Sequence, residues 1–199
     1  MFDESLLQQL VWTDYRLAIF LTVSLPLVLL IWAFVQKVEA MQRLLVIYWR
    51  VASLLAITVY LAIASLPISF ITGFMARLLI PASLWFWVDI NDEIEDRPPS
   101  PLKWTMTAWR WAVTLYCIIG AIFQAYSLRC AALTTDALVN DFACRVWLEA
   151  PWGYKAMFHP NGSPQILGFF AIVGLAVYVI CLLYFCFVRL GKQGRSALG

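Results

Sequence analysis

Long apolar runs separated by short polar segments alternate along the whole chain. A helix that crosses a lipid bilayer needs about 20 predominantly apolar residues. Five runs approach or reach this length, and they occupy residues 17–35, 44–64, 68–88, 110–127 and 166–188. The pattern therefore predicts an all-α polytopic membrane protein with about five transmembrane helices, in which residues 1–199 form one helical domain.

The polar segments between these spans set the expected layout of the rest of the chain. The longest are an outer loop at residues 128–165 and an acidic loop at residues 89–109. Apolar residues recur at helical spacing within residues 6–11, which predicts a short interfacial helix ahead of the first span. No Lys or Arg precedes Arg16, so the basic region of a secretory signal peptide is missing and the first span is expected to stay in the mature protein.

The Lys and Arg residues are divided unevenly between the two sides that an odd number of spans creates. One side and its helix ends carry Lys37, Arg43, Arg50, Arg97, Lys103, Arg110, Arg189, Lys192 and Arg195. The other side carries Arg16, Arg129, Arg145 and Lys155. Because cytoplasmic flanks collect Lys and Arg, the N-terminus is predicted to lie outside and the C-terminal tail in the cytoplasm.

Composition excludes two other classes of protein. Hydrophobic residues make up 63% of the chain and charged residues 13%, with a mean hydropathy of +0.80. A soluble domain carries about 25% charged residues, so a water-soluble globular protein is excluded. A net charge of only +2 provides no basic face for nucleic acid, which is therefore not expected as a partner. The single His excludes sites that need two imidazole ligands.

Two cysteines in the predicted outer loop point to a covalent constraint. Cys130 and Cys144 are the only cysteines in any predicted loop, which favours a disulfide on an oxidising side of the membrane. A bridge closing a loop of about 15 residues would stabilise it by roughly 3 kcal/mol in the chain-entropy model. Two unpaired thiols are the alternative.

The same loop carries a group of aromatic residues after its second cysteine. Trp147, Trp152 and Tyr154 are expected to form a docking surface, held by neighbouring Pro and Gly. Rings resting on the outer bilayer interface are the alternative. His159 could ligate a chlorophyll magnesium or move a proton, and the alternative is a hydrogen-bonded structural histidine.

The predicted cytoplasmic loop contains a compact acidic cluster that includes Asp92, Glu93 and Glu95. An EF-hand is excluded, because Ile94 stands where that loop requires Gly. Solvated side chains, or a docking site for a basic partner, explain the cluster better than metal binding does. No metal is therefore expected.

Arg77 stands about halfway along the third predicted span, where an uncompensated cation costs at least about 2.5 kcal/mol. No Asp or Glu falls within any of the five predicted spans. The partner is therefore expected to be a backbone carbonyl, a lipid phosphate, a bound ligand or another subunit, and snorkelling to the interface is the alternative. The lack of carboxylates in the spans also argues against a proton-coupled transporter.

Five strings along the chain carry a resemblance to a family. They are VWTDYRL at residues 11–17, IWAFVQK at 31–37, WFWVD at 85–89, VWLEAPWG at 146–153 and RLGKQGRS at 189–196. The chain resembles an uncharacterised family of small cyanobacterial multi-pass integral membrane proteins. The resemblance implies a photosynthetic bacterium and a thylakoid or plasma membrane, and it provides no catalytic residues that could be transferred.

Together these observations favour a protein that is not an enzyme, since no nucleophile, metal site or paired acids can be read at depth. We expect an accessory membrane protein, such as an assembly factor or peripheral subunit of a photosynthetic complex, with membrane lipid and a larger complex, for instance a photosystem, as partners. The alternative is a small transporter or a protein that binds lipid or pigment such as chlorophyll or carotenoid. Apart from that alternative, no cofactor is expected.

Overall fold

The computed structural model describes residues 4–190 and 194–196, and these form helices without any strand. In chain order the helical elements are α1 (Glu4–Ala18), η1 (Ile19–Ser24), α2 (Leu25–Val35), α3 (Glu39–Ile63), α4 (Ile68–Trp85), α5 (Val88–Glu95), α6 (Pro101–Ala125), η2 (Tyr126–Ala132), α7 (Thr135–Asn140), α8 (Phe142–Phe158), α9 (Pro164–Tyr184) and η3 (Phe185–Arg189). Lys192, one of the cations used to predict the orientation, lies outside the described residues.

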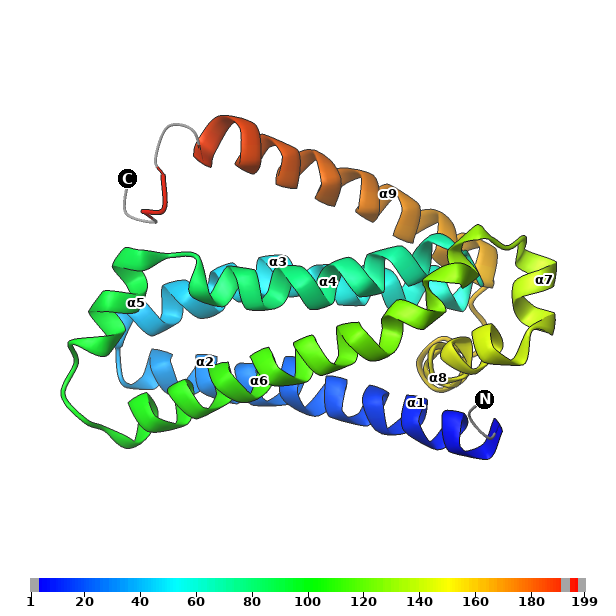
Figure 1. Ribbon diagram of the computed structural model, residues 1–199. Coiled ribbons are helices and arrows are strands. Elements are labelled where there is room, and N and C mark those ends of the chain that lie inside the picture. Colours follow the sequence, from blue (N-terminus) through cyan, green and yellow to red (C-terminus); the bar gives the residue numbers. More distant parts are fainter. Residues whose placement is uncertain (1–3, 191–193, 197–199) are drawn as a thin grey trace.

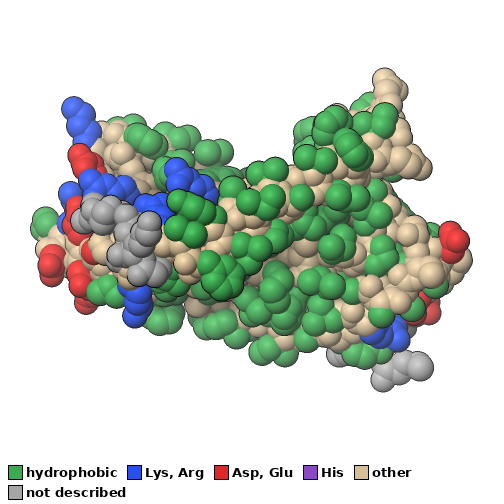
Figure 2. Space-filling view, turned by 90° about the horizontal axis from the view of Figure 1, so that it is seen from above, with side chains coloured by type: hydrophobic (Ala, Val, Ile, Leu, Met, Phe, Trp, Pro, Cys, Tyr) green, Lys and Arg blue, Asp and Glu red, His purple; other side chains and the backbone are tan. Residues whose placement is uncertain are grey.

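Five helical stretches are long and apolar enough to cross a membrane, which confirms the predicted all-α membrane protein. They are Glu4–Val35, Glu39–Ile63, Ile68–Trp85, Pro101–Ala132 and Pro164–Arg189. Hydrophobic side chains cover the middle of the molecule, while charged side chains gather near its two ends (Figure 2). This distribution is typical of an integral membrane protein, whose middle faces lipid and whose ends face water.

The long helices run side by side, with α3 at the centre of the arrangement (Figure 1). α3 packs against α2, α4 and α9, and α4 packs in turn against α6. α9 lies along the outside of α3, where Gly168 approaches Ala64 closely and Gly174 faces Ile57. Further along, the Tyr178 hydroxyl donates to the Val51 carbonyl over 3.3 Å. Among the residues of α9 only Gly168 and Ala171 are buried, so most of its surface is exposed.

The two ends of the bundle are built differently. One end, which we call the disulfide end, consists of the start of α1 together with η2, α7 and α8. There α8 lies across the bundle axis (Figure 1). The opposite end, which we call the basic end, consists of the α2–α3 connection, α5 and the end of α9. The loops predicted at residues 128–165 and 89–109 are therefore largely helical. Amphipathic pieces such as α5, which buries Ile90 and Ile94, fold once a bundle end offers them an apolar surface.

The helix that contains the first predicted span begins at Glu4 rather than near Leu17. The short interfacial helix expected at residues 6–11 does not end before the membrane, because α1 continues through η1 into α2. Because two charged residues, Asp14 and Arg16, interrupt the apolar run, the start of the first span was predicted too late in the chain. Similarly, the helix with the fourth predicted span begins at Pro101 rather than at Arg110.

The junction between α1 and α2 is a π-helical turn followed by Pro26. The Leu25 amide bonds the Phe20 carbonyl, and Pro26 has no N–H to offer to the carbonyls of Leu21 or Thr22. Side chains from other helices replace these lost donors, because unpaired buried carbonyls are unfavourable. The Trp109 indole N–H donates to Leu21 over 2.8 Å, and the Tyr48 hydroxyl donates to Thr22 over 2.6 Å.

A second proline is compensated in the same way at the disulfide end. Pro151 lies inside α8 and cannot bond the carbonyl four residues earlier, that of Trp147. The Tyr15 hydroxyl donates to this carbonyl over 2.7 Å. A tyrosine of α1 therefore connects α8 to the bundle.

Candidate functional site

Arg77 finds its partner within the same chain. Its Nη2 donates to Oδ2 of Asp14, and each of the two residues is only 9% exposed. Asp14 lies on α1, inside the first membrane helix, and Arg77 lies on α4. The prediction that the spans hold no carboxylate was therefore wrong, because the first helix starts earlier than the apolar run suggested. The absence of carboxylates from the spans was also the argument against a proton-coupled transporter, so that argument no longer holds.

Two residues of α6 complete this polar centre. The Arg77 Nε donates to Oε1 of Gln124 over 2.8 Å. The Tyr116 hydroxyl lies 3.0 Å from Oδ1 of Asp14 and donates to that carboxylate, and the Asp14 carbonyl is 3.1 Å away. The Tyr116 ring centroid is 5.4 Å from the guanidinium carbon, which adds a cation–π contact. We call Asp14, Arg77, Tyr116 and Gln124 the buried polar centre.

Two glycines make room for the centre between α4 and α6. A Cβ atom on Gly120 would lie 1.7 Å from the Arg77 Nη1, and one on Gly73 would lie 2.9 Å from the Gln124 Nε2. Gly120 therefore allows the guanidinium to approach the α6 backbone closely. Within the described residues, the Arg77 Nη1 makes no hydrogen bond, so the guanidinium keeps unused donors.

The buried polar centre connects three membrane helices through opposite charges. Its carboxylate and guanidinium neutralise one another, and hydrogen bonds from Tyr116 and to Gln124 occupy further polar atoms. Removing one partner of such a buried pair destabilises a protein by about 3–5 kcal/mol, because the other charge is left uncompensated. The arrangement therefore fixes α1, α4 and α6 relative to one another.

A second buried arginine lies closer to the basic end. Arg110 on α6 stacks on the Trp85 ring, 4.1 Å from its centroid, and donates to Oδ1 of Asn91 over 2.5 Å and to the Leu84 carbonyl over 3.3 Å. The Trp85 indole N–H donates to the Thr114 hydroxyl over 2.9 Å. These contacts connect α6 to the end of α4 and to α5.

The disulfide between Cys130 and Cys144 is confirmed. The two Cα atoms are 5.8 Å apart, and both cysteines are fully buried in a core with Val11 and Phe70. The bridge joins η2 to the first turn of α8 and closes the segment that contains α7.

The predicted aromatic docking residues are placed in different environments. Trp147 is buried against Tyr15 and Phe123, so its contribution is packing rather than an exposed contact. Trp152 is half-buried, and Tyr154 is exposed.

His159 caps the end of α8 and takes part in an aromatic cluster. Its Nε2 lies 2.9 Å from the Tyr60 hydroxyl, and its ring is next to Tyr154. This contact corresponds to the hydrogen-bonded structural histidine that the sequence left open.

The predicted acidic residues Asp92, Glu93 and Glu95 lie on the exposed face of α5. Among the described residues, no group of three or more His, Cys, Asp or Glu side chains is arranged to hold a metal ion. The acidic cluster and the aromatic residues of α8 lie at opposite ends of the molecule and form no common site (Figure 1).

Sequence reasoning singled out Arg77 but missed Asp14, Tyr116 and Gln124. A spacing signal was present, because Tyr116, Gly120 and Gln124 follow one another at four-residue intervals and so share one face of α6. Gly73 and Arg77 have the same interval on α4. Small and polar residues alternating along a membrane helix are typical of close helix contacts.

Comparison with known proteins gives a family but no relative of known activity. Residues 8–198 match the model of a family described as a protein of unknown function (DUF3177). No curated protein and no solved structure matches the chain. Because the match covers nearly the whole chain, from α1 to the tail beyond η3, this integral membrane protein belongs to the DUF3177 family.

Proposed function

We propose that the protein is a non-enzymatic accessory subunit or assembly factor that docks on a larger membrane complex. The observation that carries this proposal is an apolar edge on α8 at the disulfide end. Met157 and Phe158 are 74% and 60% exposed, and Tyr154 lies beside them with its ring 4.7 Å from that of Phe158. Large exposed apolar side chains on a rigid helix are characteristic of protein interfaces.

The α8 edge is held rigidly, which favours binding because little order has to be gained. The disulfide fixes the start of α8, and Glu149 accepts a hydrogen bond from Gln8 over 2.9 Å. The Tyr15 hydroxyl bonds the middle of α8, and the Tyr60–His159 contact holds its end. α8 is thus attached to both α1 and α3.

The buried polar centre also supports docking as a folded unit. Arg77 was expected to bond a backbone carbonyl, a lipid phosphate, a ligand or another subunit, or to snorkel to the interface, and Asp14 of the same chain is its partner instead. A partner is therefore not required to neutralise charge inside the bundle. The proposed interface accordingly lies on the surface, at Tyr154, Met157 and Phe158.

We place this surface on the outer side of the membrane. The basic end carries most of the cations and would face the cytoplasm, with the N-terminus outside. A disulfide belongs in an oxidising compartment, and Cys130–Cys144 lies at the opposite end, which agrees with this orientation. The family resemblance adds a cyanobacterial thylakoid or plasma membrane, where a photosystem or another photosynthetic complex would be the partner.

The test is affinity purification of the tagged full chain from its native membranes in mild detergent. Mass spectrometry and an absorbance spectrum are recorded on the same eluate. We expect stoichiometric co-elution of subunits of one photosynthetic complex, and at least a tenfold loss of them in the double variant Met157→Ala with Phe158→Ala. The matched control is Phe169→Ala with Phe170→Ala, which removes two exposed aromatic rings from the lipid-facing start of α9.

Equal co-elution in both double variants would contradict the α8 interface and leave its rings as bilayer contacts. A protein that elutes alone with bound pigment or solute would contradict the accessory role and favour a carrier or transporter. A protein that elutes alone and empty from gently solubilised membranes would also contradict it.

A further inference from the structure

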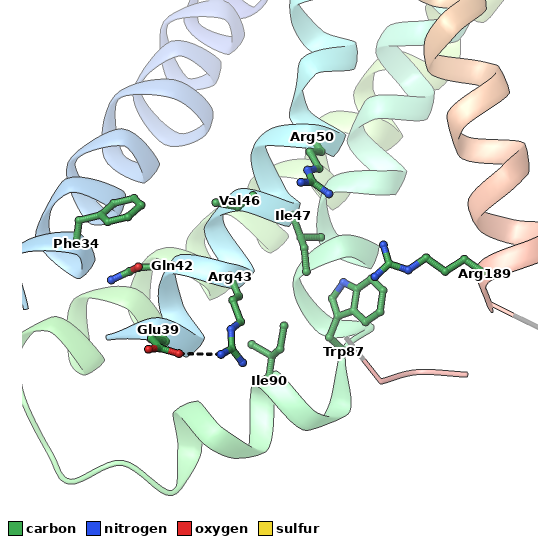
Figure 3. Close-up of a pocket in the computed structure, with 10 residues that line it drawn as sticks. All are labelled: Phe34, Glu39, Gln42, Arg43, Val46, Ile47, Arg50, Trp87, Ile90 and Arg189. Carbon is green, nitrogen blue, oxygen red and sulfur yellow. Dashed lines mark hydrogen bonds and ion pairs between the residues drawn. The ribbon is translucent and has the colours of Figure 1, made fainter. Parts of the chain in front are cut away.

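A groove at the basic end combines arginine side chains with an apolar wall. It encloses about 480 Å³ between α3, the end of α2, the start of α5 and η3. Residues of α3 from Glu39 to Arg50 recur at intervals of three and four and form its floor. Phe34 and Trp87 provide apolar walls, and Arg189 closes one side (Figure 3).

Arg50 provides an unmatched positive charge in the groove. The described residues that line it include three arginines, Arg43, Arg50 and Arg189, and one acid, Glu39. Glu39 is engaged by Arg43 in an ion pair of 2.8 Å. The guanidinium of Arg50 is exposed, and no hydrogen bond or ion pair of that group is found within residues 4–190 and 194–196. In Figure 3, Arg189 extends from η3 towards Trp87 and the space next to Arg50.

The groove reaches from the end of the bundle into the apolar region. Arg50 lies eleven residues beyond Glu39 on α3, which is about 16 Å along the helix axis. Small-molecule pockets of about 300–1,000 Å³ are large enough for a ligand of drug size. A ligand that matches this groove therefore needs an anionic group near Arg50 and an apolar part that continues beyond Arg50 into the apolar region.

We propose that this groove binds the headgroup of an anionic phospholipid. Arg50 holds the phosphodiester, and the acyl chains continue past Arg50 along the membrane-spanning surface towards the middle of the bilayer. A membrane lipid fits better than free phosphate, because its acyl chains can occupy the apolar region beyond Arg50 and the groove opens on a surface of membrane helices. Basic pockets between membrane helices on the cytoplasmic side are known to recognise lipid headgroups in this way. The inference is independent of the proposed docking function.

The experiment uses the full chain, delipidated in a neutral detergent, with phosphatidylglycerol or phosphatidylcholine added. Native mass spectrometry counts retained lipids, and the shift of the thermal unfolding midpoint with lipid concentration gives the affinity. We expect phosphatidylglycerol to be retained and to raise the midpoint, and phosphatidylcholine to have little effect. Arg50→Gln should weaken phosphatidylglycerol binding about five-fold.

Three further variants keep the result interpretable. Arg16→Gln is the matched control, because it removes an exposed arginine from a membrane helix at the opposite end of the molecule. Arg50→Lys retains the charge and should retain most of the binding. Glu39→Gln removes the acid found among the described residues that line the groove and releases Arg43, so binding should become about five-fold tighter.

Three results would overturn the proposal. The first is equal retention of the two lipids, and the second is an equal loss of binding in Arg50→Gln and Arg16→Gln. The third is protection by inorganic phosphate at the same concentration as phosphatidylglycerol, which would identify a site for a free anion. If Arg50→Gln does not fold, the proposal is tested by Glu39→Gln, which is expected to bind phosphatidylglycerol more tightly. Unchanged or weaker binding by Glu39→Gln would refute the lipid site.

Discussion

Arg77 and Arg50 are both arginines within membrane-spanning helices, but their side chains lie in opposite environments. Arg77 is enclosed between α1, α4 and α6 with an aspartate, a tyrosine and a glutamine around it. Arg50 points into a groove at the surface of α3, lined by two further arginines. The charge of Arg77 is neutralised by Asp14 inside the protein, whereas the charge of Arg50 is exposed to the surroundings.

The difference shows how depth and burial separate structural charge from binding charge. A guanidinium in low dielectric interacts strongly with a nearby carboxylate, so an internal pair stabilises a particular helix arrangement. An exposed guanidinium in the bilayer interface contributes little to folding and remains available for an anion. Variants of the two regions should therefore differ in which quantity they change: stability for Arg77 and lipid affinity for Arg50.

The largest effect is expected from Arg77→Met, which leaves Asp14 buried without a counter-charge. The free energy of unfolding should fall by about 3–5 kcal/mol. Titration with a denaturing detergent from mixed micelles measures it. The double variant Asp14→Leu with Arg77→Met should regain most of the loss, since both charges are replaced by apolar groups. A single variant as stable as the wild type would mean that the pair does not hold α1 and α4 together.

Tyr116→Phe should lower the free energy of unfolding by about 1.5–3 kcal/mol, because it removes a hydrogen bond to a charged group but keeps the ring over Arg77. The same titration gives the change. Tyr126→Phe, at an exposed position of η2, is the matched control and should change stability by less than about 0.5 kcal/mol. Equal effects of the two variants would argue against a stabilising role of the Tyr116 hydroxyl.

Gly120→Ala places a methyl group where the Arg77 Nη1 lies, so the guanidinium must move. Overpacking of this kind destabilises by about 1–3 kcal/mol. Gly174→Ala is the comparison, because its Cβ would meet Ile57 at an ordinary 3.7 Å. There the gain in helix propensity should leave stability unchanged or higher by up to about 1 kcal/mol. Should both glycines tolerate alanine equally, the close contact between α6 and Arg77 is refuted.

The smallest effect on stability is expected from Arg50→Gln in neutral detergent, less than about 0.5 kcal/mol. Its consequence should appear only when anionic lipid is added. A loss of several kcal/mol without lipid would show that Arg50 supports the fold, and the contrast with Arg77 would disappear. Thermal unfolding of the delipidated variant beside the wild type makes this measurement.

The membrane helices could be predicted from the sequence because each apolar run is long enough to cross a bilayer whatever it packs against. The disulfide could be predicted because Cys130 and Cys144 alone fell in loops. Asp14 could not be recognised as part of a span, since a hydropathy pattern scores a carboxylate as polar even where a distant guanidinium neutralises it. The start of α1 was misjudged for the same reason.

The sequence also did not indicate which of the aromatic residues are buried. Trp147 and Tyr154 look alike as members of one aromatic segment, yet one is enclosed by Tyr15 and Phe123 and the other is exposed. Helical spacing separates them only once it is known that α8 is a helix with one face on the bundle. That α8 lies across the end of the bundle depends on long-range contacts with α1 and α3.

The two prolines that rely on tyrosine hydroxyls have a consequence for how this family can vary. A residue with a backbone N–H in place of Pro26 could again bond a carbonyl of its own helix and compete with the Tyr48 hydroxyl for its acceptor. Phe in place of Tyr48 would leave the Thr22 carbonyl without its donor while proline remained. Pro26 with Tyr48, and Pro151 with Tyr15, should therefore be exchanged together among the family's members, as two coupled pairs far apart in the chain.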